Sequence, residues 1–133
     1  MTNGRRKGKE GELEIVNELK KHGVHDARRT VQHSGIEGQI GDVVCPETFP
    51  RLHFEVKRLG NISLGTKPLE DALDQAERDR PKESFPVVCW RADGTRVWKM
   101  SWRCPSLGHT LTVYSSAAIV AACGRLNEQT GDL

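Results

Sequence analysis

Three charged residues lie within two apolar, strand-like runs of this sequence, and they constrain its fold more than any other feature. Asp42 begins the run 42–45, and Glu55 and Lys57 flank Val56. Burying a carboxylate or an ammonium costs several kcal/mol unless the group is paired or binds a metal. Because alternate residues of a strand face the same side, Glu55 and Lys57 should project together while Val56 points the other way. The chain therefore has to fold so that these charges meet partners.

The hydrophobic pattern predicts an α/β fold, a mixed central β-sheet flanked by helices, in the order α-β-β-β-α-β-β-α. The predicted helices are 9–22, 69–79 and one from Ser115 or Ser116 to 123; the predicted strands are 24–31, 40–45, 51–58, 85–91 and 96–102, with a turn at 48–50 and an extended segment at 111–114. His22-Gly23 should end the first helix. The length of 133 residues predicts one domain, 1–133, with a basic arm at 1–8 and a flexible tail at 127–133.

Composition argues against a membrane protein. No apolar run approaches the ~20 residues of a membrane span, and the basic N-terminus lacks the apolar segment of a secretory signal. The 4 cysteines have no zinc-like spacing and predict a reduced, cytoplasmic setting. Net charge is only +2, but basic residues cluster at 5–9, 28–29 and 57–58, a distribution that favours a nucleic-acid partner.

Asp42 and Glu55 are candidate ligands of a divalent metal on neighbouring strands. Mg²⁺ typically takes one or two protein carboxylates and keeps its other positions for water and phosphate, and such a metal supplies most of what phosphodiester hydrolysis needs. The carbonyl of Val56 could add a ligand, and Lys57 could reach the attacking water or the phosphate. The alternative is a pair of salt bridges on an edge strand, because Glu-x-Lys alone is common by chance.

The first predicted helix offers a further acidic candidate. Its apolar face consists of Leu13, Ile15, Val16 and Leu19. At about 100° per residue, the centre of that face falls almost on Glu12. A glutamate there is costly unless it has a partner in the core, so Glu12 is expected to reach a metal or a water over the sheet. The alternative is an acid that stabilises the helix start. Glu10 and Glu14 are expected to be solvated.

Several segments together resemble one family. They are Arg6–Glu14, Ala27-Arg28-Arg29, Gln32–Gly35, Asp42, His53–Arg58, Asp74-Gln75-Ala76 and Pro86-Val87-Val88. These segments resemble archaeal-type Holliday junction resolvases and their phage counterparts, within the PD-(D/E)XK nuclease superfamily, over residues 5–102. One departure is Ile40-Gly41, which stands where many members have proline before the aspartate.

The resemblance implies a restriction-endonuclease-like fold and a homodimer that cuts branched, four-way DNA junctions. It implies Mg²⁺ as cofactor, with Mn²⁺ as a substitute, no organic cofactor and no membrane partner. It also implies the cytoplasm of a bacterial or archaeal cell, and the phage members look most similar.

By position, the resemblance assigns the acidic residues to Glu12, Asp42 and Glu55 and the catalytic lysine to Lys57. It places Ser34 in a loop where such resolvases carry a functionally important serine. Gln75, on the second helix, could orient the water or Lys57, or be an ordinary surface residue. The residues expected to contact DNA are Arg5, Arg6, Lys7, Lys9, Arg29, His33, Ser34 and Arg58. The tryptophans Trp90, Trp98 and Trp102 are expected in core or dimer packing.

The resulting hypothesis is a Mg²⁺-dependent, structure-selective DNA endonuclease that resolves four-way junctions by paired phosphodiester hydrolysis. Two alternatives stay open because a metal site fixes chemistry and not substrate. One is another PD-(D/E)XK nuclease with a repair, flap or restriction-like role. The other is a non-catalytic module that binds branched DNA.

Overall fold

The computed structural model describes residues 2–30, 42–60, 67–80, 83–92, 94–106 and 108–130, without the side chains of 2–7 and 124–130. The described residues form α1 (Thr2–Lys21), β1 (Arg28–Arg29), β2 (Val43–Cys45), β3 (Phe49–Leu59), α2 (Lys67–Asp79), β4 (Phe85–Ala92), β5 (Lys99–Arg103), β6 (Thr110–Tyr114) and α3 (Ser115–Thr130). None of these helices is both long enough and apolar enough to cross a lipid bilayer.

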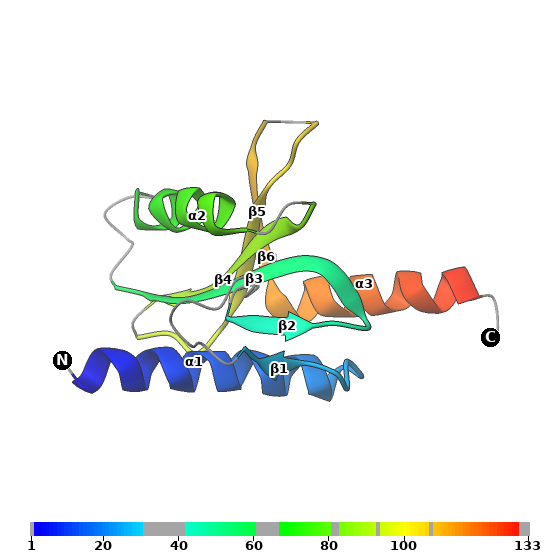
Figure 1. Ribbon diagram of the computed structural model, residues 1–133, viewed down its shortest axis with the longest axis horizontal. Helices are drawn as coiled ribbons and strands as arrows, with labels where there is room; N and C mark the ends of the chain where they lie inside the picture. The colour runs from blue at the N-terminus through cyan, green and yellow to red at the C-terminus, as the bar shows by residue number, and fades with distance from the viewer. Residues whose placement is uncertain are drawn as a thin grey trace.

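The strands make one mixed sheet in the order β1-β2-β3-β4-β5-β6. β3 and β4 pair in parallel, and the other neighbours pair antiparallel. A parallel pair needs a crossover connection, and α2 provides it. Figure 1 shows α2 on one side of the sheet and α1 and α3 on the other. The predicted α/β fold, a mixed sheet flanked by helices, is confirmed.

Each face of the sheet has its own apolar core because strand residues alternate between faces. The larger core joins α1 and α3 to the sheet and includes Ile15, Leu19, Phe54, Val56, Val87, Cys89, Trp98, Met100 and Ile119. The smaller core packs Leu69, Ala72, Leu73 and Ala76 of α2 on Leu59, Val88 and Trp90. β3 therefore turns Phe54 and Val56 toward α1, and its residues 53, 55, 57 and 59 toward the α2 side. Trp102 is partly buried against the larger core, so the expectation of core packing fits all three tryptophans.

The N-terminal elements differ from the sequence expectation in their bounds. α1 begins at Thr2, so the segment 2–8, expected as a basic arm, is helical. Within the described residues 24–30, the strand expected at 24–31 is limited to Arg28–Arg29, because the chain turns after the helix and the Ala27 N–H bonds to the Val24 carbonyl. Gly23, with φ of 97°, adopts the left-handed conformation that ends α1 as predicted. β2 begins only at Val43, and residues 40–41 lie outside the described part of the chain.

The later elements differ in the same way. β3 begins at Phe49, inside the turn expected at 48–50, and β5 begins at Lys99 and not at residue 96. Residues 110–114 form a sixth strand, β6, which the predicted element order omits. α3 continues to Thr130, so the tail expected at 127–133 is helical as far as it is described, and 131–133 lie outside the described residues.

Candidate active site

β3 carries two of the predicted site residues on one face of the sheet. Glu55 and Lys57 project toward the α2 side, whereas Phe54 and Val56 pack in the core beneath α1. The ammonium Nζ of Lys57 donates a 3.1 Å hydrogen bond to Oε1 of Gln75 on α2. The structure therefore brings Gln75 to the lysine, as the orienting role suggested for it requires, and holds the lysine on the same face as Glu55.

Asp42 lies where the chain enters β2 and is fixed against β3 by two hydrogen bonds. Its N–H donates to the Phe54 carbonyl at 2.8 Å, and its Oδ2 accepts a 2.9 Å hydrogen bond from the Val56 N–H. A carboxylate bound to a strand amide has little freedom to swing away. The hydrogen bond to Val56 therefore holds the Asp42 carboxylate next to Glu55, the preceding residue on β3.

α1 brings Glu12 to the same place because Gly11 lets the helix approach the sheet closely. A Cβ atom at Gly11 would lie 3.2 Å from the ring of Trp98 and 3.4 Å from Cγ1 of Val56. The Glu12 side chain is only 14% exposed, and its Oε1 accepts a 2.9 Å hydrogen bond from Nε of Arg29 on β1. The structure thus places Glu12 where the helical periodicity predicted it. The periodicity is wrong for Leu13, which is 42% exposed.

The carboxyls of Asp42 and Glu55 are hydrogen-bonded to each other and influence each other's protonation. Burial raises the pKa of Asp42 to about 7, and the negative charges of Glu55 and Glu12 act in the same direction. Burial also works to raise the pKa of Glu55, but contacts with polar neighbours, His53 foremost, outweigh it and lower that pKa. As pH rises, the pair therefore loses the proton of Glu55 first and that of Asp42 last.

His53 is a site neighbour to which the sequence analysis assigned no role. The residue is 1% exposed, and its Nε2 lies 3.0 Å from Oε1 of Glu55. It stands two positions before Glu55 on the same strand. The alternation that groups Glu55 with Lys57 also places His53 on that face, and this signal was available in the sequence.

The oxygen donors of this site fit a hard divalent cation such as Mg²⁺. Two carboxyls share a buried environment in which one cannot ionise freely beside the other, and a divalent cation relieves that repulsion. Within the described ranges, no group of three or more His, Cys, Asp or Glu side chains is arranged to hold a metal ion. Mg²⁺ needs only one or two carboxylates. Asp42 and Glu55 are the candidate pair, and Glu12 is engaged by Arg29.

The residues expected to contact DNA are only partly described. Lys9 is exposed on α1, Arg58 is half-buried next to Lys57, and Arg29 pairs with Glu12. The backbones of Arg5, Arg6 and Lys7 lie in α1, but their side chains are outside the described part of the chain. His33 and Ser34 lie outside the described residues altogether. Of the two arginines at 28–29, Arg29 therefore faces the site, because neighbouring strand residues point to opposite sides.

Glu14 does not fit the expectation of a solvated residue. Its Oε1 accepts hydrogen bonds from Nη1 of Arg91 at 2.8 Å and from Nε1 of Trp98 at 3.1 Å. The Arg91 guanidinium also lies 5.6 Å from the centre of the Trp98 ring. These contacts tie α1 to β4 and to the segment before β5. The partners lie 77 and 84 residues away, so local periodicity could not identify them.

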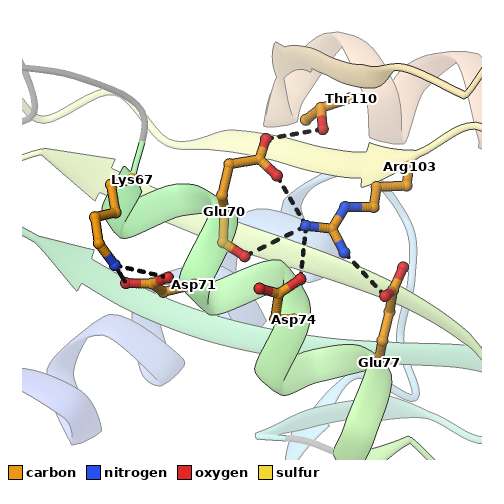
Figure 2. Close-up of polar contacts among 7 residues, drawn as sticks. All are labelled: Lys67, Glu70, Asp71, Asp74, Glu77, Arg103 and Thr110. Carbon is orange, nitrogen blue, oxygen red and sulfur yellow. Dashed lines mark hydrogen bonds and ion pairs between the residues drawn. The ribbon is translucent and has the colours of Figure 1, made fainter.

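A second group of carboxylates lies along the side of α2 that faces β5. Glu70, Asp74 and Glu77 surround the guanidinium of Arg103 on β5 at 2.8, 2.8 and 2.9 Å (Figure 2). Thr110 adds a 3.1 Å hydrogen bond to Glu70. The hydrogen bond with Glu70, together with the other acids, outweighs desolvation and raises the pKa of Arg103. We call Glu70, Asp74, Glu77 and Arg103 the α2 surface cluster.

Comparison of the chain with protein families, with curated proteins and with solved structures finds no match.

Proposed function

We propose that this chain is a Mg²⁺-dependent DNA endonuclease with a restriction-endonuclease-like fold, and that it resolves four-way junctions. The observation that carries the proposal is that the carboxyls of Asp42, which is half-buried, and Glu55, which is buried, are hydrogen-bonded to each other. Lys57 lies on the same sheet and is held by Gln75. Glu12 lies close enough for its charge to act on Asp42. Carboxylates beside an oriented ammonium are the groups that metal-assisted phosphodiester hydrolysis requires.

In this proposal Asp42 and Glu55 hold the cation, with the Val56 carbonyl as a further oxygen ligand and Glu12 acting through water. The bound cation would supply charge neutralisation at the phosphate and a water of lowered pKa. Lys57, held in place by Gln75, orients the attacking water or contacts a phosphate oxygen. In-line attack would leave a 5′-phosphate and a 3′-hydroxyl.

The four-way junction as substrate is supported by the resemblance over residues 5–102 and by the basic residues along α1. A homodimer with a two-fold axis would present two sites to opposed strands of one junction and make paired nicks. The site chemistry is shared with other PD-(D/E)XK nucleases, so the substrate has to be tested separately from the chemistry.

The deciding experiment is cleavage of a synthetic four-way junction carrying a different end label on each strand. Flap, nicked and linear duplexes of the same sequences serve as competing substrates, with Mg²⁺, Mn²⁺ or EDTA. We expect symmetric paired nicks in the junction with either metal and none with EDTA. Preferential cutting of a flap or linear duplex would refute the four-way junction as substrate but would support the nuclease activity. Junction binding without cleavage in both metals would refute the nuclease proposal in favour of a binding module.

A further inference from the structure

One buried polar side chain beside the proposed metal ligands has no part in the mechanism above. His53 is 1% exposed and lies on β3 opposite Pro86 of β4. Its side chain faces the α2 side of the sheet, together with Glu55 and Lys57. A buried imidazole needs polar partners for both ring nitrogens, and buried groups that lack them deserve an explanation.

The contact between His53 and Glu55 points to that explanation. Nε2 of His53 lies 3.0 Å from Oε1 of Glu55. An ionised carboxylate only accepts, so Nε2 has to carry the hydrogen. Within the described part of the chain, neither ring nitrogen makes a hydrogen bond of ordinary geometry. The Nε2–Oε1 distance therefore suits a hydrogen bond, but the N–H does not point at the oxygen. Such poorly aligned contacts are common in active sites that hold no substrate.

We propose that His53 is a positioning residue that orients the Glu55 carboxylate for a divalent cation. The inference rests on the proposed metal-dependent function. The 3.0 Å distance keeps the imidazole within reach of Glu55 Oε1, so that an Nε2–H could hold this carboxylate in place when a cation binds. Side chains that hold metal ligands in this way typically change metal affinity 10- to 100-fold when removed.

A second argument is that Glu55 needs an orienting partner more than Asp42 does. The Val56 amide already fixes Asp42 through a 2.9 Å hydrogen bond. His53 makes the corresponding contact to Glu55 from the same strand, with a ring that burial holds still. Each of the two proposed ligands thus has a nitrogen within 3.0 Å of its carboxylate, and only the contact to Asp42 is already an aligned hydrogen bond.

The test uses the full chain with His53→Gln, His53→Asn and His53→Leu, and follows Mn²⁺ binding by electron paramagnetic resonance. The amide nitrogen of glutamine can replace Nε2, whereas that of asparagine falls near Nδ1, away from Glu55. We expect His53→Asn and His53→Leu to weaken Mn²⁺ binding about tenfold, and His53→Gln to stay within about threefold of wild type. Metal titration of junction cleavage should show the same order, with a smaller change in rate at saturating metal.

The outcomes separate this inference from the proposed function. If wild type binds Mn²⁺ and cuts, but glutamine and asparagine variants bind Mn²⁺ equally, the positioning role is refuted and the nuclease stands. If wild type binds no Mn²⁺ at all, both are refuted. Circular dichroism checks the fold of each variant, and the Gln–Asn comparison decides the matter even if His53→Leu does not fold.

Discussion

The described structure holds two groups of three carboxylates, and their electrostatics are opposite. In the α2 surface cluster, half-exposed acids surround Arg103, and the pKa of that guanidinium is raised because the charged form is favoured. In the site, Glu12, Asp42 and Glu55 are largely buried. There burial and the neighbouring acids raise the pKa of Asp42 to about 7, so its charged form is disfavoured.

The difference teaches how to tell a structural acidic group from a functional one. The α2 surface cluster contains its own cation, and its contacts fasten α2 to β5. The site acids crowd one another at a cost to the folded state, and such strain is typical of sites built to bind or react. Removing an acid from the site should therefore affect function, whereas removing one from the α2 surface cluster should affect only stability.

The largest expected effect is on cleavage. Glu55→Gln keeps the size of the side chain but removes the charge that would bind the cation. We expect cleavage of a four-way junction to fall about 10³-fold, because a metal contributes several kcal/mol to the transition state. Junction binding, measured by gel shift, should persist. Single-turnover kinetics with Mg²⁺ measure the loss.

The matched control is Glu77→Gln, the same substitution in the α2 surface cluster. Its cleavage rate should equal that of wild type within about twofold, because surface changes away from a site have small effects. If Glu55→Gln and Glu77→Gln lost cleavage equally, the site and the α2 surface cluster would not differ in function. Wild-type cleavage by both Glu55→Gln and Asp42→Asn would refute the assignment of the site.

The second prediction concerns stability and pH. The pKa of Asp42 is raised on folding from 3.8 to about 7, so the folded protein binds this proton more tightly than the unfolded chain. That contribution to stability is complete below pH 3.8 and is lost as pH rises through about 7. In metal-free protein at pH 8, Asp42→Asn should therefore be more stable than wild type, by on the order of 1 to 4 kcal/mol.

Urea unfolding at pH 5 and pH 8 measures this difference, which should widen with pH. Asparagine can still accept the Val56 hydrogen bond, so the substitution isolates the charge. Addition of Mg²⁺ should stabilise wild type and close the gap, because a ligand that binds only the folded state stabilises it. An asparagine variant that is less stable than wild type at pH 8 would show that the site is not strained.

The third prediction concerns Arg103, the positive charge within the α2 surface cluster. Arg103→Met leaves three acids facing one another, and we expect the free energy of unfolding to fall by about 1 kcal/mol, a modest value because the acids are half-exposed. The loss should shrink in high salt, which screens the repulsion. Cleavage should be unchanged. A loss of cleavage without a loss of stability would connect the α2 surface cluster to the site.

The sequence supported the architecture and most of the site because both depend on periodicity. Alternation along β3 put Glu55 and Lys57 on one face, and helical periodicity put Glu12 over the sheet. Periodicity does not show which side chains far apart in the sequence come into contact. The contacts of Glu14 with Arg91 and Trp98 span 77 and 84 residues, and those of Arg103 with α2 span 26 and 33.

Strand ends were equally hard to predict, because hydrogen bonding decides them and not hydropathy. Of the described residues in the strand expected at 24–31, Arg28 and Arg29 form the strand, because they pair with β2. α3 extended past its apolar segment for the converse reason, since a helix needs no partner strand to continue its own hydrogen bonds. The predicted helices and strands were therefore right in kind and differ in their bounds, whereas β6 was absent from the predicted order.

The smallest expected effect is that of Asp74→Asn, which repeats the Asp42 substitution in the α2 surface cluster. Asp74 is 55% exposed and shares Arg103 with two other acids, so the guanidinium keeps partners when its charge is lost. We expect the free energy of unfolding to change by less than about 0.5 kcal/mol. The change should not grow between pH 5 and pH 8, and Mg²⁺ should not alter it. Urea unfolding beside Asp42→Asn makes the comparison direct, since one acid-to-amide change should stabilise and the other should do almost nothing. Similar pH profiles for the two variants would mean that the raised pKa of Asp42 reflects the general acidity of this region and not a site prepared for a cation.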